Sequence, residues 1–218
     1  FNIDQITISG WVKLDSSITS TLAIAGVRNT NNGLICYQLQ NSGSRSKFRF
    51  VISQEDGTYV DAVADDIHQY NTWYHVVGVA DGSDVKMYVN GVLQTVQNAY
   101  DGTIASPTQN FNIGRQPSYP LYYWGGELSN ISVFNTGLSQ PQVQTLYNNG
   151  TPEASISHSP LSWWKLDNTT TGIQDSAGSN NGTNNGATEY AGFVNSLAGE
   201  SSGMDSSNLV RSDLYRTT

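Results

Sequence analysis

The chain has 218 residues, which is enough for one sandwich domain of ordinary size and an appendage. Only 37% of the residues are hydrophobic and 13% are charged, while Gly, Asn, Ser and Thr are abundant, a composition typical of short strands joined by turns and unlike that of a helical bundle. The formal net charge of −8 argues against nucleic acid and disfavours an anionic membrane as partners, because binding to phosphate groups needs a positive field on the protein.

Alternating apolar residues predict strands from the start of the chain. Between Ile3 and Leu14, the side chains of Ile6, Ile8 and Val12 fall on one face of an extended segment. Further runs with strand character are separated by turn-forming Asn, Gly and Ser residues, and they cover 21–27, 34–40, 47–53 and 58–64. Such short, regularly spaced strands are expected of a sandwich or a barrel. Cys36 lies within one of these runs and is predicted to be a small buried residue.

Residues 72–96 predict three consecutive antiparallel strands. Asp81 to Asp84 form the first turn, and Asn90-Gly91 forms the second. Asn-Gly is the typical sequence of a type I′ hairpin turn, because both central residues need a positive φ. Further strands are predicted at 111–115 and 121–134, with a bulge or bend at Gly125-Gly126.

One short helix is predicted after these strands. Ser139 and Gln142 have the spacing of a capping box, and Gly150 is the expected stop. From Thr151 the composition changes. A strand is predicted within 162–167, and the stretch that follows is rich in Asn and Gly. The apolar residues after 187 are too sparse for a second core, so we expect an extended polar arm over 187–218.

Four segments together carry a family resemblance: ITISGWVKL, WYHVVGVADGSDVKMYVNGVLQ, FNIGRQ and GGELSNISVFNTGLSQPQVQTLYNNG. In this order they resemble laminin-G-like modules of the concanavalin A-like lectin type. The resemblance implies an all-β fold, a two-sheet antiparallel jelly-roll β-sandwich with one short helix, followed by the C-terminal arm. It implies a sandwich over 1–152 and a strand-bearing segment over 153–186 that resembles the opening strand of such a module.

The opening strand of the resembled family is missing before Phe1, and a similar stretch appears at Trp163-Trp164 and Asp175-Ser176. This stretch could complete the sandwich of its own chain, complete that of a neighbour, or begin a second module. An unpaired sheet edge is a template for a donated strand. We therefore hypothesise exchange of a strand or arm with other protein subunits, in a homo-oligomer or a viral shell. Because the chain begins at Phe1 without an initiator Met, we expect it to be a piece of a longer protein.

The sequence predicts no catalysis. Glycoside hydrolysis needs two carboxylates facing the scissile bond, and the glutamates are isolated from one another along the chain, at Glu55, Glu127, Glu153, Glu189 and Glu200. His75 lies within a strand of the core motif, where a packed and hydrogen-bonded histidine is the expected interpretation. No nucleophile-elbow motif is present.

A calcium ion is implied by the resemblance, since modules of this family often hold Ca²⁺ with loop Asp and Asn side chains. Asp81 and Asp84 are the predicted ligands, with Asp65 and Asp66, or Asp101 and Asn110, as other pairs. The alternative is that Asp81 and Asp84 only shape the turn by hydrogen bonding to its backbone.

A run of aromatic residues from Tyr119 to Trp124 gives the predicted ligand site. Aromatic rings stack on sugar faces or anchor protein interfaces, and Arg115 and Asn71 could add hydrogen bonds. The alternative is that half of the rings fill the core. The predicted ligand-binding residues are Tyr119, Tyr122, Tyr123, Trp124, Arg115 and Asn71.

The leading functional hypothesis is a non-catalytic recognition or structural module on a virion or cell surface, such as a capsid decoration protein, a fibre or an adhesin. Its partners would be protein subunits bound through the arm, or a cell-surface glycan. The alternative is a carbohydrate-binding accessory domain of a secreted polysaccharide-degrading enzyme. Both hypotheses place the chain outside the cell, and no membrane insertion is expected because no run of about 18 apolar residues occurs.

Overall fold

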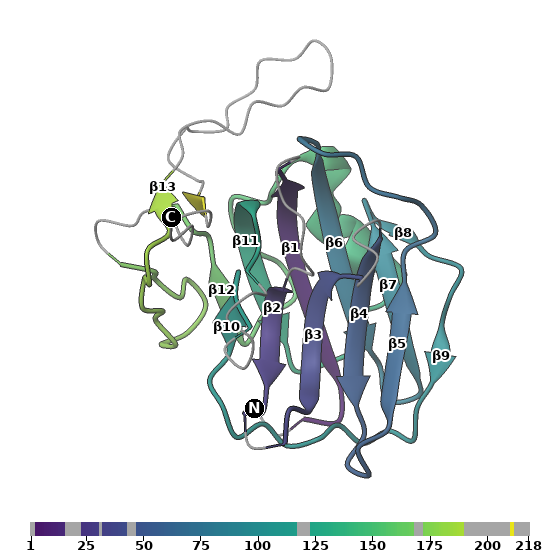
Figure 1. Ribbon diagram of the computed structural model, residues 1–218. Coiled ribbons are helices and arrows are strands. Elements are labelled where there is room, and N and C mark those ends of the chain that lie inside the picture. Colours follow the sequence, from purple (N-terminus) through teal and green to yellow (C-terminus); the bar gives the residue numbers. More distant parts are fainter. Residues whose placement is uncertain are drawn as a thin grey trace.

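The computed structural model describes residues 3–15, 23–30, 32–42, 47–116, 123–167 and 172–189, and the backbone of 210–211. Two antiparallel sheets face each other, with sheet B in front of sheet A in Figure 1 and a short helix behind sheet A. The predicted jelly-roll β-sandwich is therefore confirmed. The predicted arm lies mostly outside the described residues.

Sheet A contains the first strand of the chain, the last strands, and the hairpins between them that begin at Trp73. Its spatial order is β13 (Thr188–Glu189), β14 (Val210–Arg211), β11 (Gly126–Phe134), β1 (Ile6–Leu14), β6 (Trp73–Ala80), β7 (Asp84–Val89) and β8 (Val92–Leu93). Two more short strands attach to this order, β12 (Ser162–Trp164) on β11 and β9 (Asn98–Ala99) on β7. Sheet B has the order β10 (Asn112–Ile113), β2 (Ala23–Arg28), β3 (Ile35–Asn41), β4 (Phe48–Ser53) and β5 (Tyr59–Val63).

The main core lies between the two sheets, where the alternating residues predicted from the sequence meet. Ile8, Tyr37 and Phe50 are fully buried there. Gly78 of β6 allows this packing, because a Cβ atom at residue 78 would lie 2.1 Å from Cγ of Phe50. The Asn90-Gly91 hairpin is confirmed, with φ of 50° and 76° at its two central residues.

The predicted bulge lies elsewhere. The register of β1 against β11 shifts between Ser9 and Trp11, opposite Asn130, which has a φ of 50°. Gly126 serves a different purpose, because a Cβ atom there would lie 2.0 Å from the carbonyl oxygen of Lys13. At that position glycine permits the close approach of two backbones.

Helix α1 (Gln140–Tyr147) covers the outer face of sheet A. Its capping box is confirmed: the Gln142 side chain accepts a hydrogen bond from the Ser139 backbone N–H at 2.9 Å. The helix ends before the predicted Gly150, because Asn148 adopts a left-handed conformation and a 3₁₀ turn, η1 (Asn148–Gly150), follows. Val143 and Leu146 pack on sheet A, and no helix among the described residues has the length and apolar content needed to cross a membrane.

The segment that resembles an opening strand pairs within its own chain. Trp164 and Ser162 of β12 lie opposite Ile131 and Val133 of β11. The chain then turns back through isolated bridges, from Trp164 to Asp175 and from Ile173 to Gly182. Figure 1 shows this segment in green beside the β10 edge of the sandwich.

Candidate ligand-binding cleft

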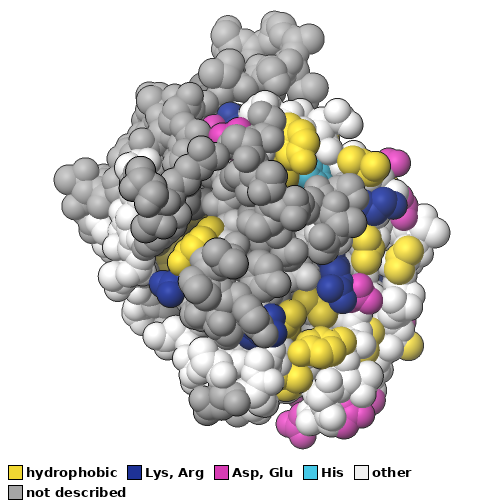
Figure 2. Space-filling model, viewed as in Figure 1, with side chains coloured by type: hydrophobic (Ala, Val, Ile, Leu, Met, Phe, Trp, Pro, Cys, Tyr) yellow, Lys and Arg dark blue, Asp and Glu magenta, His cyan; other side chains and the backbone are white. Residues whose placement is uncertain are grey.

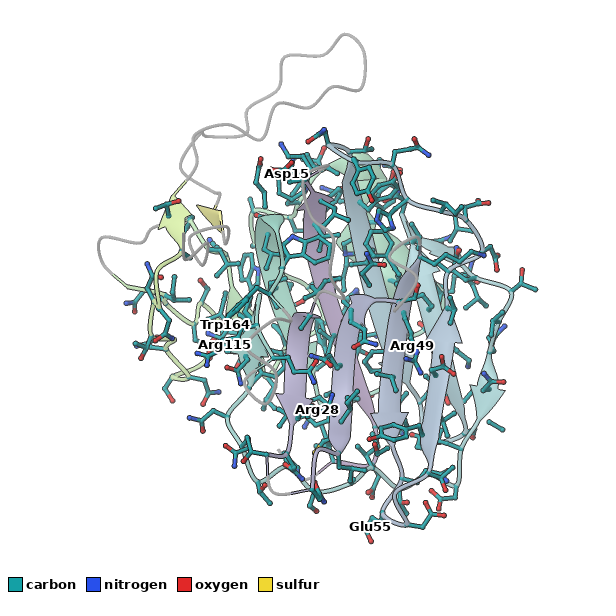
Figure 3. The ribbon with its side chains drawn as sticks, in the orientation of Figure 1. Asp15, Arg28, Arg49, Glu55, Arg115 and Trp164 are labelled. Carbon is teal, nitrogen blue, oxygen red and sulfur yellow. The ribbon has the colours of Figure 1, made fainter. Side chains whose placement is uncertain are left out.

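A cleft of about 610 Å³ opens between the β10 edge of sheet B and the segment that follows β12. One wall consists of residues 109–115 with Tyr123, and the other contains Trp164 and residues 180–185. The volume lies within the range typical of small-molecule sites. Figure 3 labels Arg115 and Trp164 close together at this edge.

Buried side chains of the sandwich line part of the cleft. Val27, Tyr37 and Leu128 are among them, and Tyr37 is fully buried. The Tyr37 hydroxyl has no hydrogen-bond partner within the described part of the chain. Burial raises the pKa of this phenol, so it remains protonated at neutral pH and keeps a proton to donate.

Two aromatic rings connect the two walls. The rings of Phe111 and Trp164 stack with their centroids 5.4 Å apart and an angle of 16° between their planes. The Trp164 indole N–H donates a hydrogen bond to the carbonyl oxygen of Asn180 at 2.8 Å. This contact fixes the beginning of the asparagine-rich stretch against the aromatic pair.

Arg115 lies on the sandwich wall beside Tyr123. Its guanidinium carbon is 6.0 Å from the centroid of the Tyr123 ring, and the backbones of the two residues form an antiparallel bridge. The Nε atom of Arg115 is buried without a hydrogen-bond partner in the described structure. The cleft thus has a positively charged group that is held by a ring and a bridge.

Asp175 holds the other wall in shape. Its Oδ1 accepts hydrogen bonds from the backbone N–H groups of Trp163, Ala177 and Gly178 at 2.9 to 3.1 Å. Its Oδ2 accepts one from Asn180 at 3.0 Å. Burial opposes ionisation of this carboxyl group, but these hydrogen bonds outweigh it and hold the pKa below its usual value.

Amide side chains dominate the rim. The described lining residues include six asparagines and one glutamine, and they include no Asp or Glu. Amides both donate and accept hydrogen bonds. The cleft therefore combines rings, amides and one guanidinium, and its described lining lacks the carboxylate pair that glycoside hydrolysis requires.

The family of the chain follows from its sequence together with this fold. Residues 1–144 match the family described as the concanavalin A-like lectin/glucanases superfamily. The chain belongs to this superfamily. No curated protein sequence matches it.

Solved structures with the same lectin-like fold are distant in sequence. A candidate carbohydrate-binding protein from Bacteroides ovatus has a TM-score of 0.68 and 19% identity, over 85% of this chain and 53% of the other. This chain thus spans about half the length of that protein. The heptameric SAP-like pentraxin of Limulus polyphemus has a TM-score of 0.55 and 17% identity, over 84% of each chain. Domain 4 of the extracellular GH43 arabinanase AbnA of Geobacillus stearothermophilus, solved with arabinotriose, has a TM-score of 0.53 and 19% identity, over 67% of this chain and 68% of the other.

The predicted ligand residues of this lectin-fold chain have separate locations. Arg115 and Tyr123 line the cleft. Trp124 does not: it is fully buried in the core, where its indole N–H donates to the carbonyl oxygen of Glu127 at 3.3 Å, so its predicted exposure was wrong. Asn71 lies at the end of β1, where its backbone N–H donates to Leu14 at 2.8 Å, and it is not among the described lining residues. Tyr119 and Tyr122 lie outside the described residues.

The predicted calcium ligands form the turn that the sequence offered as the alternative. Asp81 accepts hydrogen bonds from the backbone N–H groups of Ser83 and Asp84 at 3.0 and 2.9 Å, and it pairs with the Lys86 ammonium group. Asp101 similarly accepts from Thr103, and Asp65 from Thr95. No group of three or more His, Cys, Asp or Glu side chains suited to a metal occurs among the described residues.

His75 is packed on the outer face of sheet A. Its Nε2 lies 2.8 Å from the Ser9 hydroxyl oxygen, and its ring lies near those of Trp11 and Tyr147. Burial lowers its pKa to about 3, so the ring is neutral at ordinary pH. Cys36 is fully buried, as predicted.

Proposed function

We propose that this chain is a non-catalytic module that binds carbohydrate in the cleft between β10 and the β12 segment. The observation that carries the proposal is the composition of the cleft: half-buried Phe111 and Tyr123, an amide-rich rim and the Arg115 guanidinium within about 610 Å³. The described lining contains no carboxylate, and that is why recognition is favoured over hydrolysis.

The chemistry of this lining matches that of a sugar. Neighbouring hydroxyl groups of a sugar ring each donate and accept hydrogen bonds, and a side-chain amide offers one group of each kind. The apolar C–H faces of a sugar stack on aromatic rings such as Tyr123. Tyr37 also lines the cleft, and its buried hydroxyl has no hydrogen-bond partner in the described structure.

A binding experiment tests the proposal. We expect at least one glycan on an array to bind the chain, and Tyr123→Ala to weaken that binding about tenfold or more, because stacking and the support of Arg115 are lost together. Tyr59→Ala is the matched control, since Tyr59 is 50% exposed on β5, at the other edge of sheet B. An array without signal, or equal losses in the two variants, would contradict the proposal.

We further propose that the module works outside the cell, as part of a cell-surface or virion-surface protein. This setting is a prediction from the sequence, as are protein partners bound through residues 187–218.

The likeness to an arabinanase domain favours a second candidate, an accessory domain that holds a secreted enzyme on its polysaccharide. Binding to insoluble plant polysaccharide in a pull-down, without binding to cell-surface glycans, would favour this second candidate.

A further inference from the structure

We propose that the cleft selects an acidic sugar, whose carboxylate binds in a bidentate manner to Arg115. This inference rests on the proposed function, since it names the class of carbohydrate that the same cleft would take. It requires a cation without a counterion, a position restrained before binding, and surroundings that do not repel a carboxylate.

The charge of Arg115 has no counterion among the described residues. It is the only charged side chain among the described lining residues, and no carboxylate within the described structure forms an ion pair with it. Some other cations of the described structure do have a carboxylate partner: Lys13 pairs with Glu127 at 2.7 Å and Arg49 with Asp61 at 2.6 Å. A guanidinium group is the side chain best suited to bind a carboxylate with two parallel hydrogen bonds.

The position of Arg115 is restrained before a ligand arrives. The Tyr123 ring lies beneath the guanidinium group, and the bridge between the two backbones holds the pair at the edge of sheet B. A stacked arginine loses little conformational freedom on binding. Its buried Nε–H has no acceptor among the described residues, so an incoming carboxylate oxygen would satisfy it after a small adjustment of the side chain.

The surroundings favour one carboxylate over a polyanion. The protein has a net charge of −8, and acidic side chains gather at the lower end of the face in Figure 2, the end where Figure 3 labels Glu55. This field repels a densely charged chain but is screened beyond about 8 Å at physiological ionic strength. A single carboxylate on Arg115, with neutral hydroxyls on the asparagine rim, fits the charge of the cleft.

The test compares each acidic sugar with its own neutral form. Galacturonate, mannuronate and 3′-sialyllactose, each with one carboxylate, are titrated calorimetrically beside their methyl esters, which remove the charge and add only one methyl group. We expect at least one acid to bind about tenfold or more tightly than its ester, because hydrogen bonds to charged groups exceed neutral ones. Arg115→Gln is expected to bring acid and ester to within about twofold.

Arg49→Gln is the control, since Arg49 lies on β4 with its own partner, Asp61. It should leave the preference for the acid unchanged. Equal binding of acid and ester by the unmodified chain would overturn this inference and leave the proposed function standing. A variant Arg115→Gln that still prefers the acid would also overturn the inference and leave the proposed function standing. If no glycan binds, in these titrations or on an array, both the inference and the proposed function fail.

Discussion

The two walls of the cleft are held by different interactions. On the sandwich wall, β10 continues the ladder of sheet B: Asn112 and Ile113 pair with β2, and the Gly114 N–H donates to Ile24 at 2.7 Å. On the other wall, single bridges and the hydrogen bonds to the Asp175 carboxylate set the conformation. The first wall therefore shares the stability of the core, while the second, beyond β12, depends on a few contacts made by Asp175, Asn181 and the Trp164 indole. Folding and ligand recognition can thus be disturbed separately.

The largest expected effect is on the sandwich. Phe50→Ala removes a fully buried ring between the sheets, and we expect it to lower the free energy of unfolding by about 3–5 kcal/mol. Urea denaturation followed by tryptophan fluorescence measures this loss. Tyr59→Ala, on the exposed side of a neighbouring strand, should change it by less than about 0.5 kcal/mol. A similar loss in both variants would show that the sheets do not pack as described.

The next largest effect is a loss of stability at acidic pH, caused by His75 of the sandwich. His75 has its pKa lowered from 6.5 to about 3 by burial, so the folded chain keeps it neutral while the unfolded chain protonates it. The contribution of the neutral His75 ring to the free energy of unfolding is complete above pH 6.5. It falls by up to about 1.4 kcal/mol per pH unit as the pH decreases toward 3. We expect about 2 kcal/mol to be lost at pH 5. Denaturation at pH 7 and pH 5 measures it, and His75→Gln should flatten the slope. An equal slope in that variant would contradict the assignment.

A smaller effect on stability, but a larger one on binding, is expected at the second wall. Asp175→Asn removes the charge that strengthens four backbone hydrogen bonds, at a cost of about 1–3 kcal/mol. Hydrogen exchange should speed up at Trp163, Ala177 and Asn180, and glycan binding should weaken, while exchange in β6 stays slow.

Asp101→Asn is the control for Asp175→Asn, because Asp101 makes a similar turn with Thr103 at an exposed site. The lowered pKa of Asp175 sets the direction of its pH dependence: its stabilisation is present above the unfolded value near 4 and is lost as the pH falls through the lower folded value. Unchanged exchange in Asp175→Asn would show that this carboxylate does not organise the wall.

The smallest effect is expected at helix α1, far from the cleft. Gln142→Ala removes the acceptor for the Ser139 N–H and should cost about 0.5–1 kcal/mol. Glycan binding should not change. Gln144→Ala, at an exposed position of the same helix, is the control, and thermal denaturation compares the two variants. A Gln142 variant as stable as that control would contradict the capping box.

The sequence predicted the sandwich well because the fold depends on local patterns. Alternation marked β1 and β6, Asn90-Gly91 marked its hairpin, and the spacing of Ser139 and Gln142 marked the start of the helix. The end of the helix was misplaced because Asn148, and not Gly150, adopts the first left-handed conformation.

The cleft was predicted only in part, because its residues come from distant segments. Arg115 and Tyr123 were among the predicted ligand residues, but Phe111 and Trp164 meet through the pairing of β12 with β11, which no local pattern specifies. The exposure of Trp124 was predicted wrongly, because a ring next to tyrosines in sequence can equally point into the core. Tyr37 was not singled out from the sequence, and nothing in the pattern of β3 shows that its hydroxyl lacks a partner in the described structure.

The asparagine-rich stretch after Asp175 allows the specificity of the module to change at little cost. Residues 181–186 are exposed, but Gly182 and Gly186 are constrained by a close contact and a positive φ, respectively, and the Asn181 and Asn184 side chains accept backbone hydrogen bonds. Exchange of Thr183 and Asn185 therefore removes almost no packing, while the two sheets and the Asp175 carboxylate preserve the path of the backbone. Under the proposed function, sequence drift or a library of variants confined to these two positions therefore samples new sugars on an unchanged scaffold.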